Sequence, residues 1–96
     1  MSDRIVMYKS NYCPHSWSVE RFLNQNEVAV EYVDIDGNPE ARQKVMALNN
    51  GYASVPTLLF PDGTQLTEPS FRELRAKLGI EEEGGVVDRV KKLFGG

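Results

Sequence analysis

The order in which strand-like and helix-like segments follow one another is the strongest constraint on how this chain can fold. Short β-rich runs predict strands over residues 5–8, 31–35, 57–60 and 65–66. Apolar residues at helical spacing predict helices over residues 14–26, 39–50 and 69–78. Strands that alternate with helices and end in a hairpin favour an α/β fold, in which a mixed four-stranded sheet is flanked by three helices.

The start of the helix near residue 70 has two alternative interpretations. Ser70 and Glu73 have the spacing of a capping box, which would begin the helix at residue 71. Pro69 would also suit the first helical turn, and that placement would make Glu68 the cap. The two interpretations differ by two residues, and the sequence leaves both open. The residues expected to face inward from this helix are Phe71, Leu74 and Leu78.

Residues 81–96 differ in character from the rest of the chain. Three glutamates and two glycines at 81–85 are typical of a solvated linker. An apolar stripe at helical spacing follows, formed by Val86, Val87, Val90, Leu93 and Phe94. We expect one domain over residues 1–80, with 81–96 forming a linker and a C-terminal helix packed on that domain. A partner-binding role is the alternative for this stripe.

Composition excludes several classes of function. The 96 residues include 41% apolar side chains, enough for one compact core, and the net charge of −3 gives no nucleic-acid footprint. A single cysteine excludes an internal disulfide and cannot by itself build a zinc site. No apolar run approaches the ~20 residues that span a bilayer, and no signal peptide is evident. We therefore expect a soluble, cytoplasmic monomer without a bound metal.

The single cysteine, Cys13, stands between a predicted strand and a predicted helix. A thiol at a helix N-terminus faces unpaired backbone N–H groups and the positive end of the helix dipole. Both favour the thiolate, which is the nucleophilic form. Pro14 suits the first helical turn, where a missing N–H costs nothing. A lone cysteine is often only a small buried apolar residue, but this context favours a reactive thiol.

The element order, the chain length and the Cys-Pro-x-Ser start of the first helix resemble the glutaredoxin branch of the thioredoxin fold, over residues 4–79. Four segments, at 33–36, 54–57, 62–64 and 66–70, also resemble the mycoredoxins of actinobacteria. The resemblance implies a thiol–disulfide oxidoreductase that acts on mixed disulfides between client proteins and a low-molecular-weight thiol.

The resemblance also implies roles for individual residues. Cys13 matches the nucleophile, and Lys9 matches a lysine close to the thiolate and to the bound thiol, although an ordinary solvated lysine is its alternative. Val55 and Pro56 match a cis-proline corner, where the backbone of Val55 would pair with the cysteinyl part of that thiol. Further residues expected around the bound thiol are Tyr12, Pro14, His15, Ser16, Thr67, Glu68, Pro69 and Ser70.

Three residues of the first helix leave alternatives open. His15 is either an exposed helix residue or a group that tunes Cys13. Ser16 is either a first-turn residue or a hydrogen-bond donor to the thiolate. Trp17, an aromatic early in a helix, is expected to pack against the domain, and a platform for the substrate is its alternative.

A serine at position 16, where dithiol relatives have a second cysteine, leaves only a monothiol route. Cys13 would take the small thiol, release the protein and be restored by a second small thiol. The alternative is a carrier that bridges a [2Fe–2S] cluster between two subunits. That branch has Cys-Gly-Phe-Ser, and proline in place of glycine removes room for a cluster.

The cosubstrate expected from residues 66–70 is mycothiol rather than glutathione. Glutathione-using relatives carry two glycines, a cysteine and aspartates here, and backbone N–H groups hold the γ-glutamyl carboxylate. This chain has Leu66 and Thr67 instead of the glycines, Glu68 adds a negative charge, and Pro69 has no N–H to donate. Mycothiol lacks that carboxylate. We expect no bound cofactor beyond such a thiol.

Overall fold

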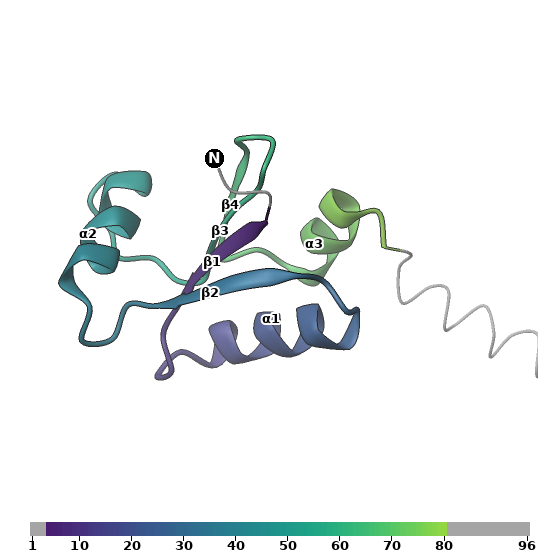
Figure 1. The fold of residues 1–96 in the computed structure, drawn as a ribbon, viewed down its shortest axis with the longest axis horizontal. Helices are drawn as coiled ribbons and strands as arrows, with labels where there is room; N and C mark the ends of the chain where they lie inside the picture. Colours follow the sequence, from purple (N-terminus) through teal and green to yellow (C-terminus); the bar gives the residue numbers. More distant parts are fainter. Residues whose placement is uncertain (1–3, 81–96) are drawn as a thin grey trace, which may run out of the picture.

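The computed structural model describes residues 4–80 and has the element order that the sequence predicts (Figure 1). The strands are β1 (Ile5–Lys9), β2 (Val30–Asp34), β3 (Thr57–Leu59) and β4 (Gln65–Thr67). The helices are α1 (Pro14–Gln25), α2 (Pro39–Leu48) and α3 (Phe71–Leu78). The predicted α/β fold is therefore confirmed. Most helices and strands begin and end within one or two residues of the predicted positions.

The four strands form one mixed sheet in the order β2-β1-β3-β4. β1 runs parallel to β2, with Lys9 opposite Asp34, and antiparallel to β3, with Tyr8 opposite Thr57. β3 and β4 form the antiparallel hairpin. Because β1 and β2 are parallel, the loops that follow them leave the same edge of the sheet.

Alternation along β1 assigns its side chains to two cores, one on each face of the sheet. Ile5 and Met7 pack with residues of α1, β3 and α3, whereas Tyr8 packs against the α2 side with Ile35 and Val45. The larger core is formed by Ile5, Met7, Val19, Phe22, Leu23, Leu58, Phe60 and Leu74. Helices α1 and α3 thus cover one face of the sheet and α2 covers the other.

The structure settles the start of α3 in favour of the capping box. Ser70 Oγ accepts a hydrogen bond from Glu73 N at 3.1 Å, and Glu73 Oε1 accepts one from Ser70 N at 2.8 Å. The expectation that Phe71 faces inward is met only in part, because 41% of the residue is exposed although its ring stacks on that of Phe22 in the larger core. Leu74 is fully buried as expected, and Leu78 is half-buried.

The predicted linker and C-terminal helix at 81–96 lie outside the described residues. Among residues 4–80, no helix is long and apolar enough to cross a membrane.

Replacing the α3 cap tests this assignment. We expect Ser70→Ala to lower the free energy of unfolding by about 1 kcal/mol, because the backbone N–H of Glu73 loses its capping oxygen. Ser70→Asp, which also supplies a capping oxygen, should retain most of the stability. Ser18→Ala, the same change at an exposed position of α1, should cost less than about 0.5 kcal/mol. Urea unfolding measures all three, and equal effects of Ser70→Ala and Ser18→Ala would contradict the cap.

Candidate active site

Cys13 is the N-cap residue of α1 and is half-buried. Its backbone is extended (φ −114°, ψ 111°), and its carbonyl accepts the first helical hydrogen bond, from Trp17 N at 3.2 Å. Pro14 occupies the first helical position and is exposed. Cys13 therefore stands at the N-terminus of α1, as the sequence predicts, although its side chain makes no capping hydrogen bond.

The Val55–Pro56 corner faces the thiol. Their peptide bond is cis, as the resemblance implied, and the Cys13 Sγ lies 3.7 Å from the carbonyl oxygen of Val55. At this distance the thiol makes a weak hydrogen bond to the backbone. Pro56 is buried, and its carbonyl accepts a hydrogen bond from Glu68 N at 2.8 Å. That contact joins this corner to the loop before α3.

His15 connects the start of α1 to the same loop. Its Nε2 lies 2.8 Å from the carbonyl oxygen of Pro69. A carbonyl only accepts, so Nε2 carries the donated proton. Pro69 is fully buried, whereas Glu68 is exposed with φ of 47°. Thr67, at the end of β4, donates to Asn49 Oδ1 at 2.6 Å.

Two residues expected beside the thiol form their hydrogen bonds elsewhere. The Lys9 Nζ pairs with Glu20 Oε1 at 2.6 Å and lies 5.7 Å from the centre of the Tyr32 ring. Burial, with the nearby Glu20 charge, raises the pKa of Tyr32. The fully buried Ser16 accepts a hydrogen bond from the backbone N–H of Ser10 at 3.4 Å. Among the described residues, neither Lys9 nor Ser16 bonds to the Cys13 sulfur.

Two carboxylates, Asp34 at the end of β2 and Asp36 just after it, hold the loop that precedes Cys13, and sequence reasoning did not assign them to the site. Asp36 accepts hydrogen bonds from Ser10 Oγ and from Asn11 N, both at 2.8 Å. Asp34 accepts one from Asn11 Nδ2 at 2.7 Å, and Ser10 Oγ accepts one from Tyr12 N at 3.1 Å. The available signal was the parallel β1–β2 pair, which places the following loops side by side.

These hydrogen bonds favour the ionised form of Asp36. The N–H of Asn11 is the largest contribution, and with the Ser10 hydroxyl it lowers the pKa of the Asp36 carboxyl below the ordinary value of 3.8. The carboxylate is therefore charged at neutral pH and holds both donors of the loop. An amide at this position would offer one acceptor oxygen where the carboxylate offers two.

Exposed aromatic rings flank the thiol. Tyr12 is 85% exposed and Trp17 is 54% exposed. The expectation that Trp17 packs against the domain is wrong, because its indole extends along the loop and donates to Asn11 O at 2.8 Å. On the α3 side, a shallow hollow of about 350 Å³ borders the helix start and is lined by Pro14, His15, Ser18, Pro69, Ser70 and Phe71.

The site thus combines a half-buried thiol at a helix N-terminus, a facing backbone carbonyl and an adjacent hollow. Within residues 4–80, no group of three or more His, Cys, Asp or Glu side chains could hold a metal ion. A thiol so placed is suited to nucleophilic attack on a disulfide.

The sequence matches the Glutaredoxin family model over residues 5–64. The chain belongs to the glutaredoxin family. Among curated relatives, a Mycobacterium tuberculosis (strain H37Rv) protein provisionally named a glutaredoxin is 36% identical over 74 residues, which cover 77% of this chain and 88% of the relative. Mycoredoxin 1 of Corynebacterium glutamicum (strain ATCC 13032) is 32% identical over 74 residues, which cover 77% of this chain and 91% of the relative.

Solved structures agree with this assignment. The thioredoxin-like protein BC3987 is similar with a TM-score of 0.66 and 29% identity, over 76% of this chain and 97% of that one. The glutaredoxin grx-1 of Archaeoglobus fulgidus is similar with a TM-score of 0.65 and 25% identity, over 77% and 84%. The thioredoxin fold is therefore confirmed, and this glutaredoxin is a thiol–disulfide oxidoreductase.

The Asp36 contacts predict a pH-dependent contribution to stability. Because the pKa of Asp36 is lower in the folded than in the unfolded state, its stabilising effect is present above the unfolded value of ~3.9 and is lost as pH falls through the folded value. Asp36→Asn should therefore destabilise this glutaredoxin near neutral pH, and the difference from wild type should shrink in acid.

Urea unfolding at about pH 7 and about pH 3, on either side of the ordinary carboxyl value, measures this difference. Glu31→Gln is the matched control, because Glu31 is exposed on β2 and makes no side-chain hydrogen bond among the described residues. It should change stability little at either pH. A deficit of Asp36→Asn that is the same at both pH values would contradict the role of the carboxylate.

Proposed function

We propose that this glutaredoxin reduces mixed disulfides between client proteins and a low-molecular-weight thiol by a monothiol mechanism, with mycothiol favoured over glutathione. The observation that carries the proposal is the placement of Cys13, the one cysteine of the sequence, at the N-cap of α1 and 3.7 Å from the Val55 carbonyl oxygen. The similarity of the chain to Mycoredoxin 1 supports the choice of mycothiol.

The chemistry has two exchange steps. The Cys13 thiolate attacks the small-thiol sulfur of the mixed disulfide, a new S–S bond forms, and the client leaves as a thiolate that takes up a proton. A second small thiol, as its thiolate, then attacks the sulfur that Cys13 carries. That step releases the small thiol as its symmetric disulfide and restores the Cys13 thiolate. Each mixed disulfide reduced thus consumes one free small thiol, and the symmetric disulfide released contains that thiol and the one that the client carried.

Position 16 supports the monothiol route. A dithiol mechanism needs a second cysteine thiol within reach of Cys13, and Cys13 is the one cysteine of the sequence. Ser16 is fully buried and bonded to Ser10, so its hydroxyl serves the conformation of the loop. The step that frees Cys13 then falls to an external thiol.

The loop before α3 supports discrimination against glutathione. At positions 68–70, Glu68 N already donates to Pro56 O and Ser70 N to Glu73 Oε1, each at 2.8 Å. Pro69 between them has no N–H. In glutathione-using relatives backbone donors in this region hold the γ-glutamyl carboxylate, whereas here these residues present the exposed Glu68 carboxylate instead. Mycothiol, which lacks the γ-glutamyl group, does not need those donors.

Cys13→Ser tests the mechanism. We expect turnover of a mixed-disulfide substrate to fall to background, because the hydroxyl is not a nucleophile towards sulfur at neutral pH. The urea midpoint should change little, since Cys13 is half-buried at a helix end and not part of either core. Turnover near the wild-type rate would contradict the assignment of Cys13. Visible absorbance of the purified wild-type protein, together with no turnover, would favour the iron–sulfur carrier.

The preference for mycothiol is tested by measuring kcat/KM with each thiol. Loss of one charge-assisted hydrogen bond is worth ~1.5–3 kcal/mol, so wild type should use mycothiol at least about tenfold more efficiently than glutathione. Glu68→Gln removes the repulsion alone. It should raise the glutathione value by about two- to fivefold, the range for an exposed charge, and leave the mycothiol value nearly unchanged.

Glu40→Gln removes a charge from the first turn of α2 and is the control for net charge. It should change neither value appreciably. A wild-type preference for glutathione would overturn the cosubstrate assignment but leave the monothiol mechanism intact, because that mechanism depends on Cys13 and not on this loop.

A further inference from the structure

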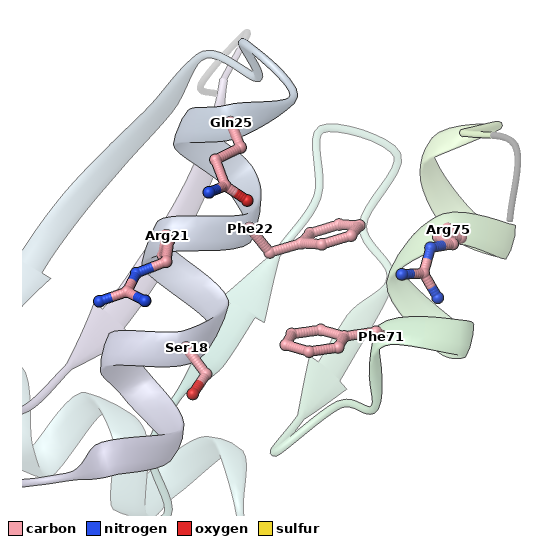
Figure 2. A pocket seen from close by; sticks show the side chains of 6 residues that line it. All are labelled: Ser18, Arg21, Phe22, Gln25, Phe71 and Arg75. Atoms are coloured by element: carbon pink, nitrogen blue, oxygen red, sulfur yellow. The ribbon is translucent and has the colours of Figure 1, made fainter. Parts of the chain in front are cut away.

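A groove of about 400 Å³ runs between α1 and α3, beyond the active site (Figure 2). Its lining residues are Ser18, Arg21, Phe22, Gln25, Phe71 and Arg75. Figure 2 shows Phe22 and Phe71 reaching towards each other from the two helices, with Arg75 beside them. The proposed thiol chemistry does not use this groove.

The groove combines aromatic surface with positive charge. The rings of Phe22 and Phe71 stack with centroids 5.1 Å apart and an interplanar angle of 14°. The Arg75 guanidinium carbon lies 5.3 Å and 5.9 Å from the two ring centroids. Arg21 is exposed on α1, and none of the groove's lining residues within 4–80 is an aspartate or glutamate. Its occupant should therefore carry acidic groups together with apolar side chains.

The described chain ends beside one end of this groove. Gly79 caps α3 in the left-handed conformation with φ of 70°, and the N–H of Ile80 bonds back to Arg75 O at 2.9 Å. Ile80 also packs against the larger core. Residue 80 thus follows the C-terminal end of α3, and Figure 2 shows Arg75, the groove residue nearest that end, opposite Phe22 and further towards Gln25 than Phe71 is.

The sequence that follows Ile80 has the complementary chemistry. We propose that residues 81–96 occupy the α1–α3 groove, with Glu81–Glu83 opposite Arg21 and Arg75. The apolar stripe of Val86, Val87, Val90, Leu93 and Phe94 would then cover the Phe22–Phe71 pair.

The dimensions agree with this placement. Three extended residues span up to ~10 Å, enough to carry the chain from Ile80 past the guanidinium of Arg75. As a helix, the nine residues 86–94 measure about 13 Å, and the groove wall from Ser18 to Gln25 about 12 Å. The segment would run from the Gln25 end of the groove towards the Ser18 end.

This direction has a consequence for the active site. Ser18 and Phe71 line both the groove and the hollow that contains His15, Pro69 and Ser70. The far end of the segment, near Leu93, would therefore lie at the rim of the Cys13 site. The segment would then cover the exposed face of Phe71 and form one side of the approach to the thiol.

Spin labelling of the full chain tests the placement. In a chain with Cys13→Ser and Gly95→Cys, a nitroxide attaches at position 95 alone, because Cys13 is the one natural cysteine. The expected result is selective broadening of the amide signals of His15, Ser18 and Phe71. The signals of Ala41 and Val45, on the α2 side of the sheet, serve as the reference and should broaden much less.

Three further labelled chains supply the comparisons. Val90→Ser with Leu93→Ser should release the segment and abolish the selective broadening, whereas Lys92→Ser, between the apolar positions, should retain it. Arg21→Glu should weaken it, because a carboxylate would then face Glu81–Glu83.

Three outcomes would overturn the proposal. These are equal broadening on the α1–α3 and α2 sides, selective broadening that survives Val90→Ser with Leu93→Ser, and selective broadening that appears only between labelled and unlabelled copies in a mixed sample. The last outcome would assign the groove to a second copy of the chain. None of them depends on thiol turnover, so the result is independent of the proposed cosubstrate.

Discussion

The pairing of β1 with β2 on one side and β3 on the other is the constraint on which the site depends. β2 is parallel to β1 and β3 is antiparallel, so the end of β1, the end of β2 and the beginning of β3 meet at one edge of the sheet. The loops attached there carry Cys13, Asp36 and Val55. A one-residue slip of β1 would exchange Met7 and Tyr8 between the two cores, and burial on both faces therefore fixes the register.

Backbone groups, more than charged side chains, form the immediate surroundings of the thiol. The Cys13 Sγ bonds to the Val55 carbonyl, and Cys13 stands at the N-cap of α1 without a side-chain hydrogen bond to the helix. The carboxylate of Asp36 does not bond to the thiol but accepts a hydrogen bond from Ser10, at the start of the loop that leads to Cys13. The charge of Lys9 is paired with that of Glu20, whereas Cys13 itself stands at the positive end of the α1 dipole.

The sequence predicted the parts of the molecule that local patterns determine. The strand and helix order, the place of Cys13 at the helix start and the capping potential of Ser70 depend on neighbours in sequence. The cis corner followed from resemblance alone. The Asp36 contacts depend on which loops become neighbours, and the Lys9–Glu20 pair joins residues eleven apart on two elements, so residue patterns alone did not indicate them.

Helix α1 links these features because its period of 3.6 residues gives each face a different function. Its first turn carries Cys13 and His15, and its inner face carries Val19 and Leu23 in the core. Its outer face, with Ser18, Arg21 and Gln25, forms one wall of the groove against α3. Phe22 belongs both to the core and to the groove. Any change that shifts α1 against α3 must therefore alter the groove and the hollow beside the thiol together, since the two share Ser18 and Phe71.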